Sequence, residues 1–167
     1  MIVYLNGEYV PADQARISPL DRGFLFGDGI YEAIPSYEGR AVALQLHLER
    51  MKRGLAAISL KSPLTDQDWK RVARELSERN GGGNLGIYLH ISRGNEGRRL
   101  HRFPEGMAPT IFGMVLAIEP PPPAPDRHSR AGLRVATPKT FAGIVVISNP
   151  PPCWAIYCTF KRATKPA

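Results

Sequence analysis

The chain has 167 residues and 43% hydrophobic residues, which suits one domain, or one domain with part of a second, and excludes a wholly disordered chain. Its 22 Lys and Arg against 15 Asp and Glu give a net charge of +7. No apolar run approaches the roughly 20 residues of a membrane helix, and the start of the chain lacks the features of a signal peptide. A cytoplasmic protein is therefore expected.

The positive charge is unevenly placed. Every acidic residue lies between Glu8 and Asp126, so residues 127–167 carry none. A basic tail can bind nucleic acid or an anionic membrane, but these charges are sparse and mixed with Pro, Cys and Trp. We therefore expect neither partner. The two cysteines, Cys153 and Cys158, form no disulfide framework, and we assign them no metal or redox role.

Two hairpins are predicted near the start of the chain. Asn6-Gly7 separates two short apolar runs, residues 2–5 and 8–10, and Asn-Gly is a strong signal for a tight β-turn. Glu38-Gly39 separates residues 30–37 from 40–44 in the same way.

Two helices are predicted next. Leucine and methionine recur at helical spacing over residues 44–57. A second helix begins after Thr65, where a hydroxyl is followed three residues later by an acid, and it ends at the glycine-rich residues 80–83. Its apolar face consists of Trp69, Val72, Ala73 and Leu76.

Two strands complete the predicted domain. Residues 87–91 alternate between apolar and polar side chains, and residues 111–118 are mostly apolar. Hairpins mixed with helices indicate an α+β domain over residues 1–119. The Pro-rich segment 120–137 is interpreted as a linker and the start of a second domain, with one further strand at 133–136.

Residues 21–32 form the first candidate motif, DRGFLFGDGIYE. Its three glycines indicate tight turns or a close approach of the backbone to a ligand. Their spacing matches neither a phosphate-binding loop nor a dinucleotide fingerprint. On spacing alone, a turn that leads into a strand is the favoured interpretation.

Two further segments carry cations. His47 and Arg50 lie three residues apart on one face of a predicted helix, and an arginine there can hold a phosphate bidentately. Residues 93–102 contain five cations and one acid in a glycine-containing loop after a strand, which suits a carboxylate or phosphate ligand. A solvated helix face and a solvated basic loop are the alternative interpretations.

Together these motifs resemble those of the fold-type IV (class IV) pyridoxal-phosphate aminotransferases, and most closely the D-amino acid (D-alanine) aminotransferases. The resemblance runs in order from Met1 to about Thr137 and rests on residues 21–32, the His47/Arg50 pair and Arg99-x-His101 followed by Phe-Pro-Glu. It implies the α+β small domain of that fold, with the large domain missing.

The resemblance also implies roles for individual residues. Arg50 matches the arginine that holds the phosphate of pyridoxal 5'-phosphate. Tyr31, Arg99 and His101 match the trio that binds the substrate carboxylate in D-amino acid enzymes. His47 matches a histidine near the site whose role stays open. The implied reaction moves an amino group from a D-amino acid to a 2-oxo acid in a homodimer.

The family also has a lysine that forms a Schiff base with the cofactor, in a stretch resembling Arg-Trp-x-Arg-Cys-Asp-Ile-Lys-Ser. That stretch is absent from this sequence, so no catalytic lysine is assigned. Two enzymes with the same fold remain as alternatives, the branched-chain aminotransferases and the aminodeoxychorismate lyases. A small basic module that binds anions is the alternative outside enzymes.

Residues 138–167 suggest why the lysine is absent. From Phe141 on, the last base of each codon can be joined to the first two bases of the next. The shifted frame can then spell Arg-Trp-His-Arg-Cys-Asp-Ile-Lys-Ser, with the lysine codon across Ser148 and Asn149. We hypothesise that residues 138–167 are an out-of-frame translation, which predicts a poorly ordered tail and an inactive chain.

Overall fold

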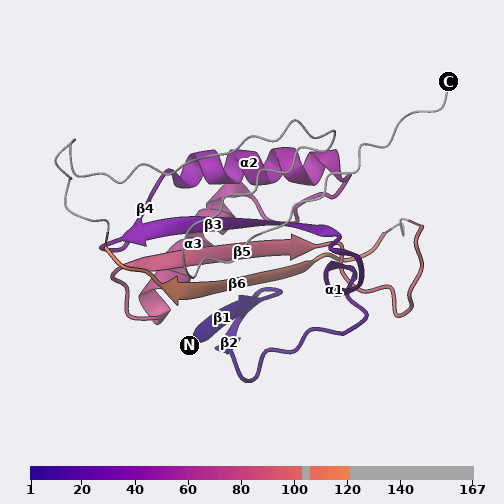
Figure 1. Cartoon of the computed structure of the whole chain (residues 1–167), viewed down its shortest axis with the longest axis horizontal. Coiled ribbons are helices and arrows are strands. Elements are labelled where there is room, and N and C mark those ends of the chain that lie inside the picture. Colours follow the sequence, from indigo (N-terminus) through magenta and orange to yellow (C-terminus); the bar gives the residue numbers. More distant parts are fainter. Residues whose placement is uncertain (103–105, 121–167) are drawn as a thin grey trace, which may run out of the picture. The chain divides into compact units, whose positions relative to one another are not determined.

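The computed structural model describes residues 1–102 and 106–120. Six strands form one antiparallel sheet in the order β2-β1-β6-β5-β3-β4 (Figure 1). Sheet and helices together confirm the predicted α+β class. The elements are β1 (Ile2–Leu5), β2 (Glu8–Pro11), α1 (Arg22–Phe26), β3 (Gly29–Tyr37), β4 (Arg40–Ala41), α2 (Leu44–Ala57), α3 (Asp66–Arg79), β5 (Leu85–Ser92) and β6 (Thr110–Ala117).

Both predicted hairpins are present. Asn6 and Gly7 have φ values of 50° and 106°, and Glu38 and Gly39 have 50° and 76°, so both turns use the left-handed region. The second hairpin is shorter than predicted, because β4 ends at Ala41 and not at residue 44. Ala43, with φ 49°, is the N-cap of α2, so residues 42–44 lead into that helix instead of continuing the strand.

Both predicted long helices are also present. Helix α2 covers the predicted residues 44–57. Helix α3 begins at Asp66, where the Thr65 hydroxyl and the Asp68 carboxylate form a capping box with the backbone. The predicted apolar face of α3 is buried. The short helix α1 was not predicted, since five residues carry no readable periodicity.

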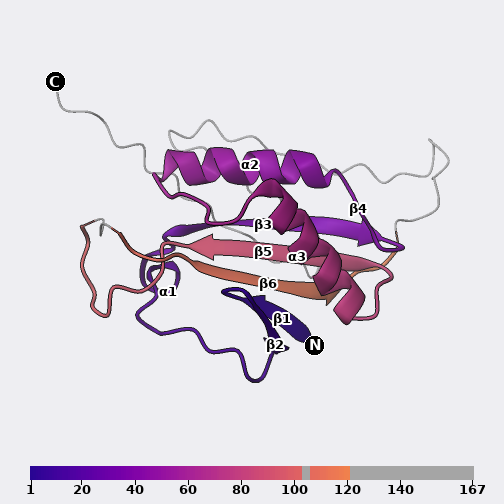
Figure 2. The ribbon, with the colours of Figure 1, turned by 180° about the vertical axis from the view of Figure 1, so that it is seen from behind.

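The core lies between the sheet and helices α2 and α3. Figure 2 shows α3 crossing in front of the sheet, with α2 along the β3 side. Alternate residues of the central strands, such as Ile34, Ile87 and Leu89, are fully buried against Leu48 and Leu76 of the two helices. Apolar burial of this kind is the main source of stability for the domain.

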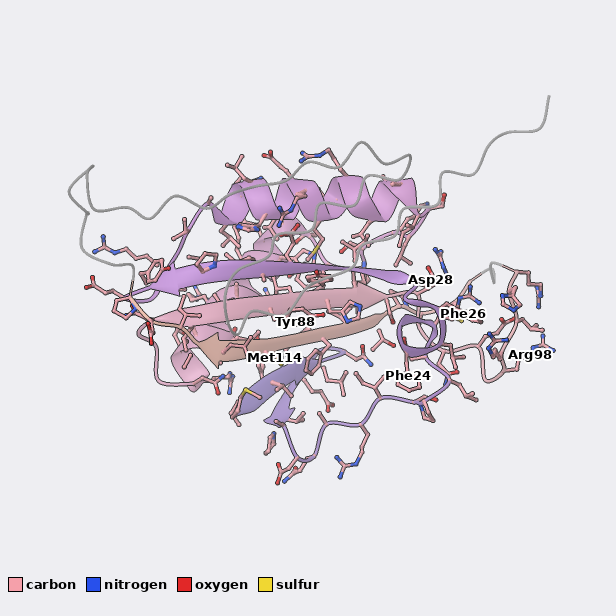
Figure 3. The ribbon with its side chains drawn as sticks, viewed as in Figure 1. Phe24, Phe26, Asp28, Tyr88, Arg98 and Met114 are labelled. Carbon is pink, nitrogen blue, oxygen red and sulfur yellow. The ribbon has the colours of Figure 1, made fainter. Side chains whose placement is uncertain are left out.

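The opposite face of the sheet carries the other set of alternating side chains. Tyr88 and Met114 point toward the viewer in Figure 3, away from α3. Tyr31 of β3 and His90 of β5 pair directly and lie on this same face. Residues 17–24, which include the start of α1, lie against one end of it.

Several predictions fall outside the described residues. They are the linker and start of a second domain predicted over 120–137, apart from residue 120, the strand at 133–136, the tail 138–167 and the two cysteines. Within the part of the chain that is described, none of the helices has the length and apolar character needed to cross a bilayer.

Candidate functional site

The motif at residues 21–32 is held in place by its first acid. Asp21 is buried and caps α1 by accepting a hydrogen bond from the Gly23 N–H at 2.8 Å. Its carboxylate also accepts the hydroxyls of Ser92 at 2.7 Å and Thr110 at 2.6 Å. These contacts attach α1 to the ends of β5 and β6. Gly23 serves the same packing, since a Cβ on it would lie 2.8 Å from the Cβ of Ser92.

Asp28 joins two buried arginines. It accepts from Nε of Arg22 at 2.8 Å, and from Nε and Nη2 of Arg93 at 2.8 and 3.0 Å. Burial alone would raise the pKa of the Asp28 carboxyl, but hydrogen bonds from Arg93 and Arg22 hold that pKa below its ordinary value. Arg93 also donates to the carbonyl of Ile58 at 2.7 Å, which ties the end of α2 to this cluster.

Glu32 of β3 is the third buried acid. It faces α2, where Arg50 donates from Nε at 2.7 Å and from Nη2 at 2.5 Å, and Nδ1 of His47 lies 2.7 Å from Oε2. Burial would raise the pKa of Glu32, yet the hydrogen bonds from Arg50 and His47 lower it below its ordinary value. Glu32 is therefore an anionic anchor for both predicted cations of α2.

Arg50 keeps one side of its guanidinium for another ligand. Its side chain is 64% exposed, and the pair with Glu32 uses Nε and Nη2 but not Nη1. The hydrogen bond to Glu32 raises the pKa of Arg50, with a smaller contribution from the Tyr31 phenol. A fixed, charged guanidinium of this kind fits a phosphate group.

Tyr31 and Arg50 lie on opposite faces of the sheet, near the same edge. Strand β3 pairs with β4 only at Ser36 and Tyr37, so its earlier residues form an edge of the sheet. Arg50 approaches this edge from the helix-covered face, whereas Tyr31 lies on the opposite face and stacks on Tyr88 with ring centroids 5.5 Å apart. Tyr31 therefore lies on the face that carries His90, and Arg50, the candidate phosphate ligand, approaches from the other face.

Arg99 and His101 lie together on the loop between β5 and β6. Nη1 of Arg99 is 3.4 Å from Nε2 of His101, and both side chains are exposed. The Phe26 ring contacts both, with its centroid 5.0 Å from the Arg99 guanidinium and 5.2 Å from the His101 ring. Two adjacent donors on an aromatic surface suit a carboxylate.

The predicted site residues therefore fall into two groups. His47 and Arg50 are brought together by Glu32, with Tyr31 nearby, and Arg99 and His101 form a pair on a separate loop. Their proposed binding roles stay predictions.

The sequence indicated residues 21–28 only as structural support for Tyr31, so the contacts of Arg22 and Phe26 with the Arg99/His101 loop were not predicted, and Glu32 was given no role. One signal was available for Glu32, because an acid between Ile30 and Ile34 on a buried strand face needs a cation. Phe26 gave no comparable signal.

A cleft of about 460 Å³ lies beside α1 on the open face of the sheet. Ile17, Phe24, Phe112 and His90 line it, and burial lowers the pKa of the His90 imidazole below its ordinary value. Among the described residues, no group of three or more His, Cys, Asp or Glu side chains is arranged to hold a metal ion.

Comparison with known families agrees with this arrangement. Residues 29–155 match the model of the family described as amino-transferase class IV. This range covers Tyr31, Glu32, Arg50 and the Arg99/His101 loop. The chain belongs to the class IV aminotransferases, a family of pyridoxal-phosphate enzymes.

Two curated relatives of this chain are named D-alanine aminotransferase. The chain is 35% identical to a D-alanine aminotransferase of Staphylococcus haemolyticus over 135 residues, which are 81% of this chain and 46% of that protein. It is 30% identical to a D-alanine aminotransferase of Bacillus licheniformis over 137 residues, or 82% and 47% of the two chains. The chain thus spans about half the length of the curated relatives it matches.

Solved structures show the same fold. A branched-chain aminotransferase of Thermoproteus uzoniensis superposes with a TM-score of 0.64 over 71% of this chain and 41% of that chain, at 22% identity. A hypothetical aminotransferase of Mycobacterium tuberculosis, solved in a PLP-bound form, gives 0.59 over 71% and 40%, at 26% identity. The described sheet and helices therefore match less than half of each larger structure.

Proposed function

We propose that the family function of this chain is transfer of an amino group from a D-amino acid to a 2-oxo acid. The pairing of Arg99 with His101 on the Phe26 ring carries this proposal, because it offers two donors to a substrate carboxylate. The identity to relatives named D-alanine aminotransferase supports the D-amino acid class. Tyr31 is proposed as the third carboxylate ligand.

The cofactor proposed is pyridoxal 5'-phosphate. Its phosphate would be held by Arg50, which is exposed, charged and oriented by Glu32. When bound, the cofactor ring supplies the electron sink that lets a substrate lose its Cα proton. His47 contacts Glu32 at 2.7 Å and the Arg50 guanidinium at 3.5 Å, and so supports the same ion pair.

We further propose that the chain as written is inactive, because no lysine stands in the expected sequence context. Of the lysines in the described part, Lys52 pairs with Asp66 at 2.6 Å on the surface of the two helices. The proposed whole enzyme is a cytoplasmic homodimer that binds neither nucleic acid nor membrane. Light scattering tests the dimer, and salt-dependent binding to nucleic acid would favour the basic-module alternative.

The proposed reaction is tested on protein made from the gene with its frame restored. D-alanine, L-leucine and aminodeoxychorismate are compared as substrates, and D-alanine is expected to give the highest kcat/KM. Arg99→Gln should lower kcat/KM for D-alanine about 10- to 100-fold, the value of a charge-assisted pair.

Arg98→Gln is the matched control for this substitution. Arg98 is the adjacent, 65% exposed arginine, which faces Glu96 at 3.8 Å, so its loss should leave kcat/KM unchanged. A preference for L-leucine would replace the proposed substrate class. Equal activity of the Arg99→Gln variant and the parent would remove Arg99 from the site.

A further inference from the structure

The described residues of the loop that carries Arg99 and His101 belong to no helix or strand. Both side chains are exposed, so water competes with the hydrogen bond between them. A pair held at 3.4 Å therefore needs support from outside the loop. Helix α1, packed beside this loop in Figure 3, supplies two such supports.

The first support acts on the loop backbone. The Arg22 N–H donates to the Gly94 carbonyl at 2.8 Å, near the start of the loop. Its Nη1 donates to the carbonyl of Leu100 at 2.6 Å, the residue between the two proposed ligands, and reaches that of Arg102 at 3.4 Å. One residue therefore fixes both ends of the segment.

Arg22 is itself immobilised. It is 4% exposed, and its Nε donates to Asp28 at 2.8 Å. A lysine at this position has a single ammonium group and cannot serve the carboxylate and two carbonyls with the same geometry. Only a guanidinium can join Asp28 to the carbonyls of Leu100 and Arg102 in this geometry.

The second support acts on the side chains. The half-buried Phe26 ring lies 4.7 Å from the Arg22 guanidinium as well as close to Arg99 and His101. The ring attracts the Arg22 and Arg99 guanidiniums, and the His101 ring packs on the same aromatic surface. The ring therefore sets the spacing of the pair before any ligand arrives.

We propose that Arg22 and Phe26 are positioning residues that preset Arg99 and His101 for a carboxylate. The proposal rests on the proposed function of that pair. Presetting the donors removes an ordering cost from binding, so loss of either support should weaken carboxylate affinity without removing a ligand.

The test uses the 167-residue chain itself, with acetate as the probe and acetamide as its uncharged counterpart. The imidazole NMR signal of His101, assigned with His101→Gln, is followed during each titration. Acetate should shift this signal saturably in the parent, and acetamide should not. Phe26→Leu and Arg22→Lys should each raise the acetate Kd about fivefold or more, as expected for lost pre-organisation.

Two matched variants separate positioning from general destabilisation. Phe24→Leu makes the same change in the same helix at a ring that is 79% exposed and lines the cleft. Arg93→Lys changes the other buried arginine on Asp28, whose donors reach Ile58 and Ser59 instead of residues 100–102. Both controls should keep the parent acetate Kd.

The outcomes distinguish the two proposals. If the parent shows no saturable acetate shift, the carboxylate site is wrong and the positioning role is overturned with it. If the parent binds and Arg99→Gln abolishes binding, but Phe26→Leu and Arg22→Lys bind like the controls, the site stands and the positioning role is wrong. If Arg22→Lys fails to fold, the acetate Kd of Phe26→Leu alone tests the positioning role.

Discussion

Two buried carboxylates, Asp21 and Glu32, and the nearly buried Asp28 account for the acids of residues 21–32. Asp21 takes hydroxyls and a backbone N–H, Asp28 takes two arginines, and Glu32 takes Arg50 and His47. Each carboxylate therefore has hydrogen-bond donors or cations as partners, and a charge without such partners would be too costly to bury. The contact with Glu32 also orients Arg50 toward the proposed phosphate.

The Glu32→Gln variant tests the central ion pair. Glu32 is 2% exposed, and the amide loses the charge that orients Arg50. Because Arg50 itself is exposed and can be solvated, we expect a loss of about 1–3 kcal/mol in the free energy of unfolding. Urea denaturation of the parent chain and the variant measures this loss. Glu49→Gln, the same change at an exposed position on α2, should have no measurable effect.

The same carboxylates predict how stability depends on pH. The folded-state pKa values of Asp28 and Glu32 are below their ordinary values, so both groups stabilise the fold above the unfolded pKa values of about 4. This stabilisation is lost as the pH falls through that range toward the folded-state values. Urea midpoints should therefore drop below about pH 4. The urea midpoint should fall less steeply with pH in Glu32→Gln than in the parent. Equal falls in the two proteins would show that Glu32 does not cause the pH dependence.

At the scale of elements, what could be predicted followed from local pattern. Helices α2 and α3 have long amphipathic repeats, and the hairpin turns have residues that tolerate positive φ. The short helix α1 depends on contacts of Asp21 with strands about 70 and 90 residues away, which no local pattern encodes. The hydrogen bond from Arg22 to the carbonyl of Leu100 also joins residues far apart in the chain, so local pattern could not predict it.

The capping box of α3 gives a prediction at this scale. Thr65→Ala removes the hydroxyl that accepts the Asp68 N–H at 3.2 Å. Loss of an N-cap hydroxyl costs about 1 kcal/mol in the free energy of unfolding. Thr65→Ser keeps the hydroxyl and should behave like the parent in urea denaturation. Equal stability of the alanine variant would show that α3 is held by packing alone.

For the whole molecule, the described domain supplies the cation that fits a phosphate and the paired donors that fit a carboxylate. Neither group is a covalent attachment point for the cofactor, and the chain spans about half of its curated relatives. The proposed reaction therefore depends on residues beyond the described domain. If the codons of residues 138–167 encode these missing residues in another frame, the sequence is an out-of-frame reading of a whole aminotransferase gene.

Resequencing the gene from the codons of Leu133 to well past Ala167 tests the proposed frame. We expect a single shift before Phe141 to place a lysine codon across Ser148 and Asn149, within Arg-Trp-His-Arg-Cys-Asp-Ile-Lys-Ser. Codons that cannot spell this stretch in the shifted frame would contradict the proposal. If the DNA itself proves to be in frame for the lysine, the protein made from it should show transaminase turnover. If the shift is present in the DNA, Arg50, Arg99 and His101 belong to a site that this locus does not complete.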